Sequence, residues 1–104
     1  MHINEFAKMN HERSVKHDAQ KIFNWEYYAI AIGGEAGELL NVLKKTKRGD
    51  FPLNKAALAE ETADIITYAF LLLSELGVDH EQIILEKFEK VNKRLDAGGF
   101  SARP

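Results

Sequence analysis

The 104-residue chain is predicted to fold as an all-α domain. Only two prolines occur, Pro52 and Pro104, so long segments lack the residue that most strongly interrupts a helix. Within these segments apolar residues recur at helical spacing. Runs in which β-branched apolar residues alternate with polar ones, which would indicate strands, are missing. We therefore expect an up-and-down, four-helix bundle-like domain.

Size and composition exclude several classes of protein. The length predicts a single domain over residues 1–104, with its core at about 25–95. The absence of cysteine rules out disulfides, cysteine zinc sites and thiol catalysis. A net charge of −2 gives no overall attraction for nucleic acid or acidic membranes, and no apolar run approaches the ~20 residues that span a bilayer. The first residues lack the layout of a signal peptide. We expect a cytoplasmic protein without nucleic-acid or membrane partners.

The first two helices differ in how clearly the sequence marks them. The first is expected from about Asn4 to Lys16 and is only weakly amphipathic. The second should start after Asn24, a good N-cap, and end before Gly49, which is expected to adopt the left-handed conformation that ends a helix. Its apolar stripe consists of Trp25, Ile32, Ala36, Leu39 and Leu43. Three glycines at 33, 34 and 37 each cost about 1 kcal/mol relative to alanine, which suggests close approach by another helix or a ligand, or a local distortion of the helix.

The third and fourth helices are bounded by similar signals. Asn54 should cap the third, which runs to about Leu76, and Gly77 should stop it. Asp79 should cap the fourth, which continues to about Leu95. The expected stripes are Leu58, Ile65, Ala69, Leu72 and Leu76 on the third helix, and Ile84, Phe88, Val91 and Leu95 on the fourth. Residues 97–104 are predicted to be a mobile tail.

Two acid pairs lie on the borders of the second and third stripes. Glu35 and Glu38 are three residues apart, as are Glu61 and Asp64, so each pair shares one helix face. The short connection favours antiparallel neighbours, which would gather four carboxylates in one small volume. Like charges in a partly apolar setting need a cation, and Mg²⁺ prefers oxygen ligands. The sequence therefore predicts a divalent metal site.

The same residues resemble a known family. The pattern Glu-x-x-Glu, a spacer and Glu-x-x-Asp, with the surrounding segments 34–40 and 58–65, is similar to the signature of the MazG-like all-α nucleoside triphosphate pyrophosphohydrolases. Gly77 and the helix after it also resemble the family, so the likeness covers about 25–95. One departure is Gly34, where many members carry an acid. That position is not among the four acids.

The resemblance implies an enzyme that hydrolyses a (d)NTP, non-standard or surplus, to the monophosphate and pyrophosphate. It also implies that Mg²⁺, or Mn²⁺ as a substitute, is held by the four acids, which would be both metal ligands and catalytic residues. They are Glu35, Glu38, Glu61 and Asp64. A triphosphate carries about four negative charges and needs such an ion to lie beside carboxylates. Homodimers or homotetramers built through the helices are implied as well.

Four further residues are candidates for substrate binding. Lys45 belongs to a basic run at 44–48 that either satisfies the helix C-terminus or clamps phosphate, within its own chain or from a neighbouring subunit. Lys87 and Arg94 share a flank of the fourth helix, where they would bind phosphate or pair with acids. Trp25 could stack on a base, but its place on the apolar stripe favours core packing.

Two other interpretations differ from the enzyme in what they require. A di-iron carboxylate bundle would use Glu-x-x-His pairs, which the two central helices lack. A non-catalytic helical oligomerisation or regulatory module would keep the fold without binding metal. This second interpretation predicts no metal-dependent thermal shift and no release of pyrophosphate.

Overall fold

The computed structural model describes residues 1–98, and all regular secondary structure in this part of the chain is helical. The helices are α1 (Ile3–His17), α2 (Trp25–Arg48), α3 (Lys55–Glu75) and α4 (His80–Asp96). The predicted all-α class is therefore confirmed, and every predicted helix end lies within one residue of the observed one. Of the predicted tail at 97–104, residues 99–104 lie outside the described residues.

The predicted caps form as the local sequence indicates. Asn24, Asn54 and Asp79 each precede a helix, and each accepts a hydrogen bond from the backbone N–H three residues later, at 2.8–3.1 Å. Gly49 ends α2 with φ 85° and Gly77 follows α3 with φ 72°, which are left-handed values that glycine adopts without steric cost. The boundaries of the central helices are thus set by local chemistry.

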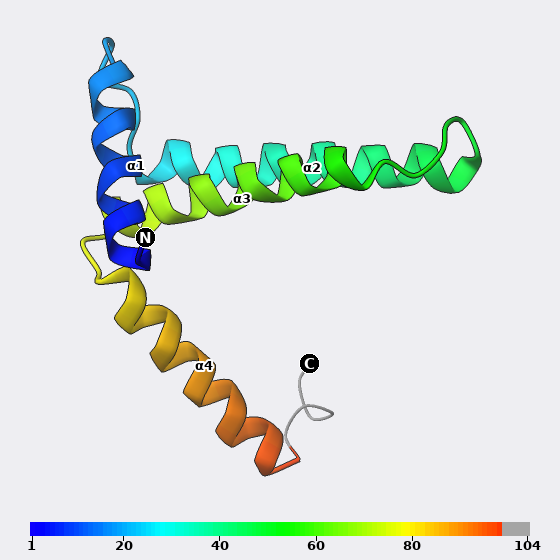
Figure 1. Cartoon of the computed structure of the whole chain (residues 1–104). Helices are drawn as coiled ribbons and strands as arrows, with labels where there is room; N and C mark the ends of the chain where they lie inside the picture. Colours follow the sequence, from blue (N-terminus) through cyan, green and yellow to red (C-terminus); the bar gives the residue numbers. More distant parts are fainter. Residues whose placement is uncertain (99–104) are drawn as a thin grey trace.

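Helices α2 and α3 form a long antiparallel hairpin, and α1 lies across its base (Figure 1). The middle of each predicted stripe is half-buried along the hairpin, including Ile32 and Ala36 on α2 and Ile65 on α3. A hydrogen bond of 3.0 Å from Asn10 Nδ2 to the carbonyl oxygen of Thr67 joins α1 to α3. The hairpin is therefore the part of the fold that brings the two acid-bearing helices together.

The prediction that Trp25 packs in the core is wrong, because its side chain is 51% exposed. Trp25 is the first residue of α2. Side chains of a helix lean toward its N-terminus, so the side chain at this position extends past the end of the helix. An apolar stripe that is assigned only from the angle of each residue around the helix does not take this lean of the side chains into account. The outer stripe residues Leu43 and Leu76, near opposite ends of the hairpin, are also exposed.

Helix α4 packs on the rest of the chain only near its start. Asn4 Nδ2 donates to the Asp79 carboxylate at 3.2 Å, and His80 is buried. Beyond this point α4 leaves the hairpin and has no contact with α2 (Figure 1). Most of its predicted core face is uncovered: Val91 is half-buried, but the exposed fractions are 38% for Ile84, 62% for Phe88 and 45% for Leu95. The helical spacing correctly predicted an apolar face on α4, but it did not predict what packs against that face.

One chain alone therefore does not close its helices around a common core. Its accessible surface of 7966 Å² is about a third larger than the ~5,900 Å² expected of a compact monomer of 11.8 kDa. Its radius of gyration is 16.8 Å, whereas a compact chain of this length has about 13 Å. None of the described helices is both long and apolar enough to cross a membrane.

His80 is expected to anchor α4. Its Nε2 lies 2.8 Å from the carbonyl oxygen of Phe70, and its ring packs on the Phe70 ring at 5.2 Å between centroids. His80→Ala should lower the free energy of unfolding by about 1–3 kcal/mol, because the buried ring loses its hydrogen bond to Phe70 and its packing on the Phe70 ring. Urea denaturation at one fixed protein concentration measures this. The exposed His2, which makes no side-chain cap bond, gives the control His2→Ala. Equal effects of the two substitutions would contradict the anchor.

Candidate metal centre

The hairpin brings three of the four predicted acids together. Glu35 and Glu38 on α2 and Glu61 on α3 each offer one carboxylate oxygen, and these three oxygens lie within 4.8 Å of one another. Glu35 and Glu61 are half-buried between the helices, whereas Glu38 is exposed. The cluster therefore has a closed side against the hairpin and an open side toward solvent.

Two oxygen atoms of the cluster lack a partner. When both carboxylates are ionised, Oε2 of Glu35 and Oε2 of Glu61 are shielded from solvent, and neither has a hydrogen-bond donor among the described residues. Burial of an unsatisfied polar atom is unfavourable, and it is more so when the group is charged. A cation between the two carboxylates would satisfy both atoms. Ordinary surface acids keep their carboxylate oxygens in contact with water, so this pair of orphaned oxygens distinguishes the cluster from them.

The facing carboxylates also perturb their own ionisation. The closeness of Glu61, with which a protonated Glu35 shares a hydrogen bond, raises the pKa of Glu35 to about 7. Desolvation and the negative charges of Glu38 and Asp64 act in the same direction. The neighbouring carboxylates therefore oppose loss of the Glu35 proton at neutral pH. A bound cation would instead favour loss of this proton.

The donor set fits Mg²⁺. In octahedral coordination at 2.0–2.1 Å, adjacent ligand oxygens are about 2.9 Å apart and opposite ones about 4.1 Å apart. The three oxygens, all within 4.8 Å, need only small side-chain shifts to reach these values. The ligands are oxygens alone, which also suits Mn²⁺. Glu35 and Glu61 would hold the ion from the closed side and Glu38 from the open side.

Asp64 lies beside this group rather than within it. It is one turn after Glu61 on α3 and is exposed. Its charge contributes to the raised pKa of Glu35, which places it within electrostatic reach of the cluster. Asp64 also lines a neighbouring pocket of about 280 Å³ between α1, α3 and the start of α2. It therefore stands between the cluster and the pocket.

The predicted substrate-binding residues are spread over the chain. Lys45 is seven residues beyond Glu38, about 10 Å further along α2 toward the hairpin tip. Lys87 and Arg94 are on α4, which does not contact α2, so one chain does not bring them to the acids. Trp25 is exposed and does not line the pocket. A role for these four in binding stays a prediction.

The glycines of α2 do not serve packing within the chain. A methyl group added at Gly33, Gly34 or Gly37 would meet no atom within 4 Å. The idea that another helix of the same chain approaches them closely is therefore wrong. α3 lies on the stripe side of α2, and the glycines lie on a different face.

Sequence reasoning missed most residues of the pocket beside Asp64. Tyr68 follows Asp64 by four positions, so both lie on one face of α3. Burial raises the pKa of Tyr68, as do the nearby charges of Tyr27, Glu35, Asp64 and Glu38. That i+4 spacing was a signal for Tyr68. The contribution of α1, including Arg13, had no comparable signal because it depends on how α1 crosses the hairpin.

The perturbed Glu35 predicts a pH dependence of stability. With its pKa at about 7 when folded and 4.5 ordinarily, the folded chain holds a proton that the unfolded chain has lost between these values. The contribution of Glu35 to stability therefore falls as pH rises from about 4.5 to 7, and the full loss persists above 7. Mg²⁺ should offset this loss most at pH 8. Thermal unfolding at pH 5, 7 and 8, in EDTA or in MgCl₂, measures both effects.

In the same experiment Glu35→Gln should flatten the pH dependence relative to the unmodified chain and remove most of the Mg²⁺ effect. Glu60→Gln changes an exposed acid on α3 outside the cluster and is the matched control. An unchanged pH slope in Glu35→Gln, or an equal loss of the Mg²⁺ effect in Glu60→Gln, would contradict the assignment.

Comparison with known proteins adds the family. Residues 31–100 match the profile of the MazG-like family, a match that contains α3, α4 and all four acids. Helix α1 and the loop after it lie outside the matched segment. Neither the curated proteins nor the solved structures yielded a match. Because the profile spans more than half of the chain, the protein belongs to the MazG-like family.

Proposed function

We propose that the protein is a Mg²⁺-dependent nucleotide pyrophosphohydrolase that converts a (d)NTP, non-standard or surplus, to the monophosphate and pyrophosphate. Membership of the MazG-like family suggests this type of function. The observation that carries the proposal is the cluster of three carboxylate oxygens within 4.8 Å, two of whose residues also hold orphaned buried oxygens. A solvated acidic face with no task would not bury carboxylate oxygens without partners.

In this proposal the role of each of the four acids follows from its exposure to solvent. Glu35 and Glu61 hold the cation from within the hairpin, and Glu38 and Asp64 face the side from which the triphosphate arrives. When bound, Mg²⁺ neutralises phosphate charge and lowers the pKa of water. A water oxygen bonds to the α-phosphorus as the bond to the bridging oxygen breaks, so pyrophosphate leaves and a proton is released to solvent.

The enzyme is proposed to work as a homodimer or homotetramer. Each chain exposes about 2,000 Å² more surface than a compact monomer would, which is of the order that obligate homodimers bury. Two apolar faces are uncovered, one on α4 and one on α2. The α2 face consists of Ile30, Gly33, Gly34, Gly37 and Leu40. A second copy is the occupant that explains both faces, since small residues let another helix approach closely.

A second copy would also account for the cations of α4. Lys87 and Arg94 are held away from the acids of their own chain because α4 does not contact α2. Across an interface they are proposed to reach a triphosphate bound at the acids of another copy. Lys45, on the same helix as Glu35 and Glu38, is proposed to bind phosphate along the hairpin. Trp25, exposed at the start of α2, is available for contact with substrate.

Substitution of the acids tests the function. Glu38→Gln and Asp64→Asn should each lower pyrophosphate release from a (d)NTP panel by about 10- to 100-fold, because the first removes a charge from the carboxylate cluster and the second a charge beside it, without changing side-chain shape. Glu60→Gln should keep the rate of the unmodified chain. Coupled detection of pyrophosphate, with Mg²⁺ and with EDTA, gives the rates. Unchanged turnover in Glu38→Gln or Asp64→Asn would contradict the site, and no turnover of any (d)NTP would favour the non-catalytic module.

Substitution of Phe88 tests the assembly. The unmodified chain should sediment as a dimer or tetramer of the 11.8 kDa chain. Phe88→Glu should shift it toward the monomer, since a charge would be buried in an apolar interface. Lys90→Glu, on the opposite face of α4, should leave the mass unchanged. Sedimentation equilibrium gives the masses. A monomeric unmodified chain, or identical behaviour of the two variants, would overturn the proposed interface.

A further inference from the structure

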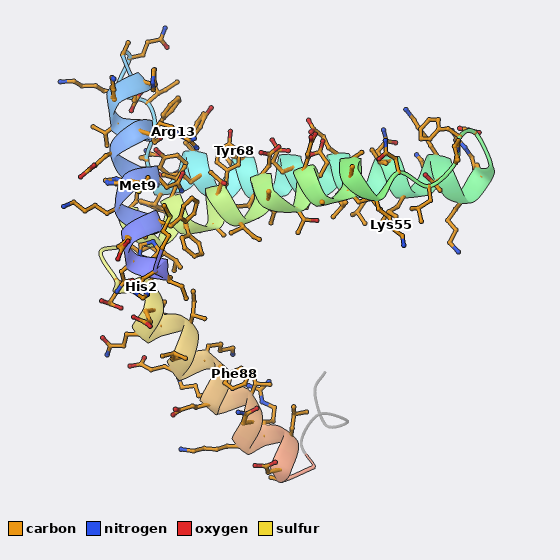
Figure 2. All side chains as sticks on the ribbon, viewed as in Figure 1. His2, Met9, Arg13, Lys55, Tyr68 and Phe88 are labelled. Carbon is orange, nitrogen blue, oxygen red and sulfur yellow. The ribbon has the colours of Figure 1, made fainter. Side chains whose placement is uncertain are left out.

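The pocket beside Asp64 is built from three separate segments. Its walls come from α1, from the stretch Phe23 to Tyr28 that leads into the first turn of α2, and from α3, which contributes Tyr68. Its volume of about 280 Å³ is near the lower end for small-molecule sites, which suits one end of a nucleotide rather than a whole triphosphate. Figure 2 labels Arg13 on α1 and Tyr68 on α3, where α1 crosses the hairpin. None of the acid cluster's three close members lines it.

One wall of the pocket is aromatic. Phe23 and Tyr27 stack with their ring centroids 4.6 Å apart and their planes at 24°. Tyr28 meets Tyr27 edge-on at 5.8 Å, and Tyr68 lies 6.5 Å from Tyr28. Tyr28 is fixed by a hydrogen bond between its hydroxyl and that of Ser14 on α1. Aromatic walls of this kind bind the flat faces of bases by stacking.

A guanidinium group is held at the same pocket. Asn10 is buried, and its Nδ2 donates to α3 while its Oδ1 accepts a 3.3 Å hydrogen bond from Arg13 Nη2. The bond to Asn10 uses one of the five N–H groups of Arg13, so others remain free to donate. Held in this way, Arg13 offers a fork of donors to acceptor atoms on a base edge.

The position of Asp64 decides which end of a nucleotide the pocket suits. Asp64 is the acid that belongs to the pocket lining and also acts on the charge of Glu35. Without a cation its carboxylate would repel a phosphate that entered the pocket. Phosphates are favoured at the metal cluster on one side of Asp64, and an uncharged aromatic group is favoured on the other side.

We propose that this pocket binds the base of the substrate nucleotide and that Arg13 is the residue that discriminates between bases. The proposal rests on the proposed function, because the phosphates of the same nucleotide lie at the acid cluster. The discriminating wall comes from α1 and the loop after it, both outside the segment that matches the family. Base choice would then depend on residues that the family match does not cover.

The test measures binding separately from catalysis. Dissociation constants are measured by calorimetry for the monophosphates of adenosine, guanosine, cytidine, uridine and thymidine, and for Mg²⁺-pyrophosphate as a probe without a base. Three chains are compared: the unmodified protein, Arg13→Gln and Lys16→Gln. Lys16 is an exposed cation of α1 that does not line the pocket, so it controls for the loss of one positive charge.

The unmodified chain and Lys16→Gln should prefer one base over the others by about tenfold or more, which one good arginine–base contact can supply. Arg13→Gln should lose most of this preference while its affinity for Mg²⁺-pyrophosphate stays within twofold. A preference that survives in Arg13→Gln would overturn the proposal. So would an equal loss of affinity for every ligand including pyrophosphate, because Arg13 would then be a phosphate ligand.

The pocket and the proposed function can fail separately. If no (d)NTP is hydrolysed but monophosphates bind with an Arg13-dependent preference, the base site stands and the hydrolase proposal fails. If triphosphates are hydrolysed but base preference does not depend on Arg13, the hydrolase stands and the base site fails. If no monophosphate binds to the unmodified chain, the base site is overturned.

Discussion

The α2–α3 hairpin holds the carboxylates of Glu35 and Glu61 face to face although their charges repel. Helix packing supplies the force, because half-buried apolar residues along both helices lie on the stripes that border these acids. The repulsion appears as two orphaned oxygens and as a pKa of about 7 for Glu35. A protein that maintains such a contact without a cation sacrifices stability, whereas one that binds a cation recovers it.

The other two helices serve this hairpin in different ways. Helix α1 crosses its base and adds a polar wall next to Asp64. Helix α4 is anchored at His80 and then departs, which leaves most of its apolar face uncovered and keeps the cations Lys87 and Arg94 from contact with α2. The proposed second copy would use that face, so folding and assembly would be linked. The three close carboxylates meet within one chain, whereas Lys87 and Arg94, which are proposed to bind phosphate, do not reach them in the same chain.

Local chemistry explains what could be predicted from the sequence. Caps such as Asn24 and Asp79 bond to the adjacent turn, so the residues next to a helix end determine where the helix begins. The spacing of Glu35 and Glu38 sets a shared face for the same reason. Positions that depend on how helices cross were harder to predict. The exposure of Trp25, the departure of α4 and the place of Arg13 all arise from tertiary geometry that a helical wheel does not contain.

The central claim is that the hairpin holds a divalent cation between its acid pairs. Its most direct test is crystallographic, with Mn²⁺ as the ion and its anomalous scattering as the signal. The account predicts an anomalous peak within about 2.0–2.4 Å of carboxylate oxygens from Glu35, Glu38 and Glu61, and no such peak in Glu38→Gln crystals grown in the same way. A Mn²⁺ peak elsewhere with none at these acids, or an equal peak in the variant, would contradict it.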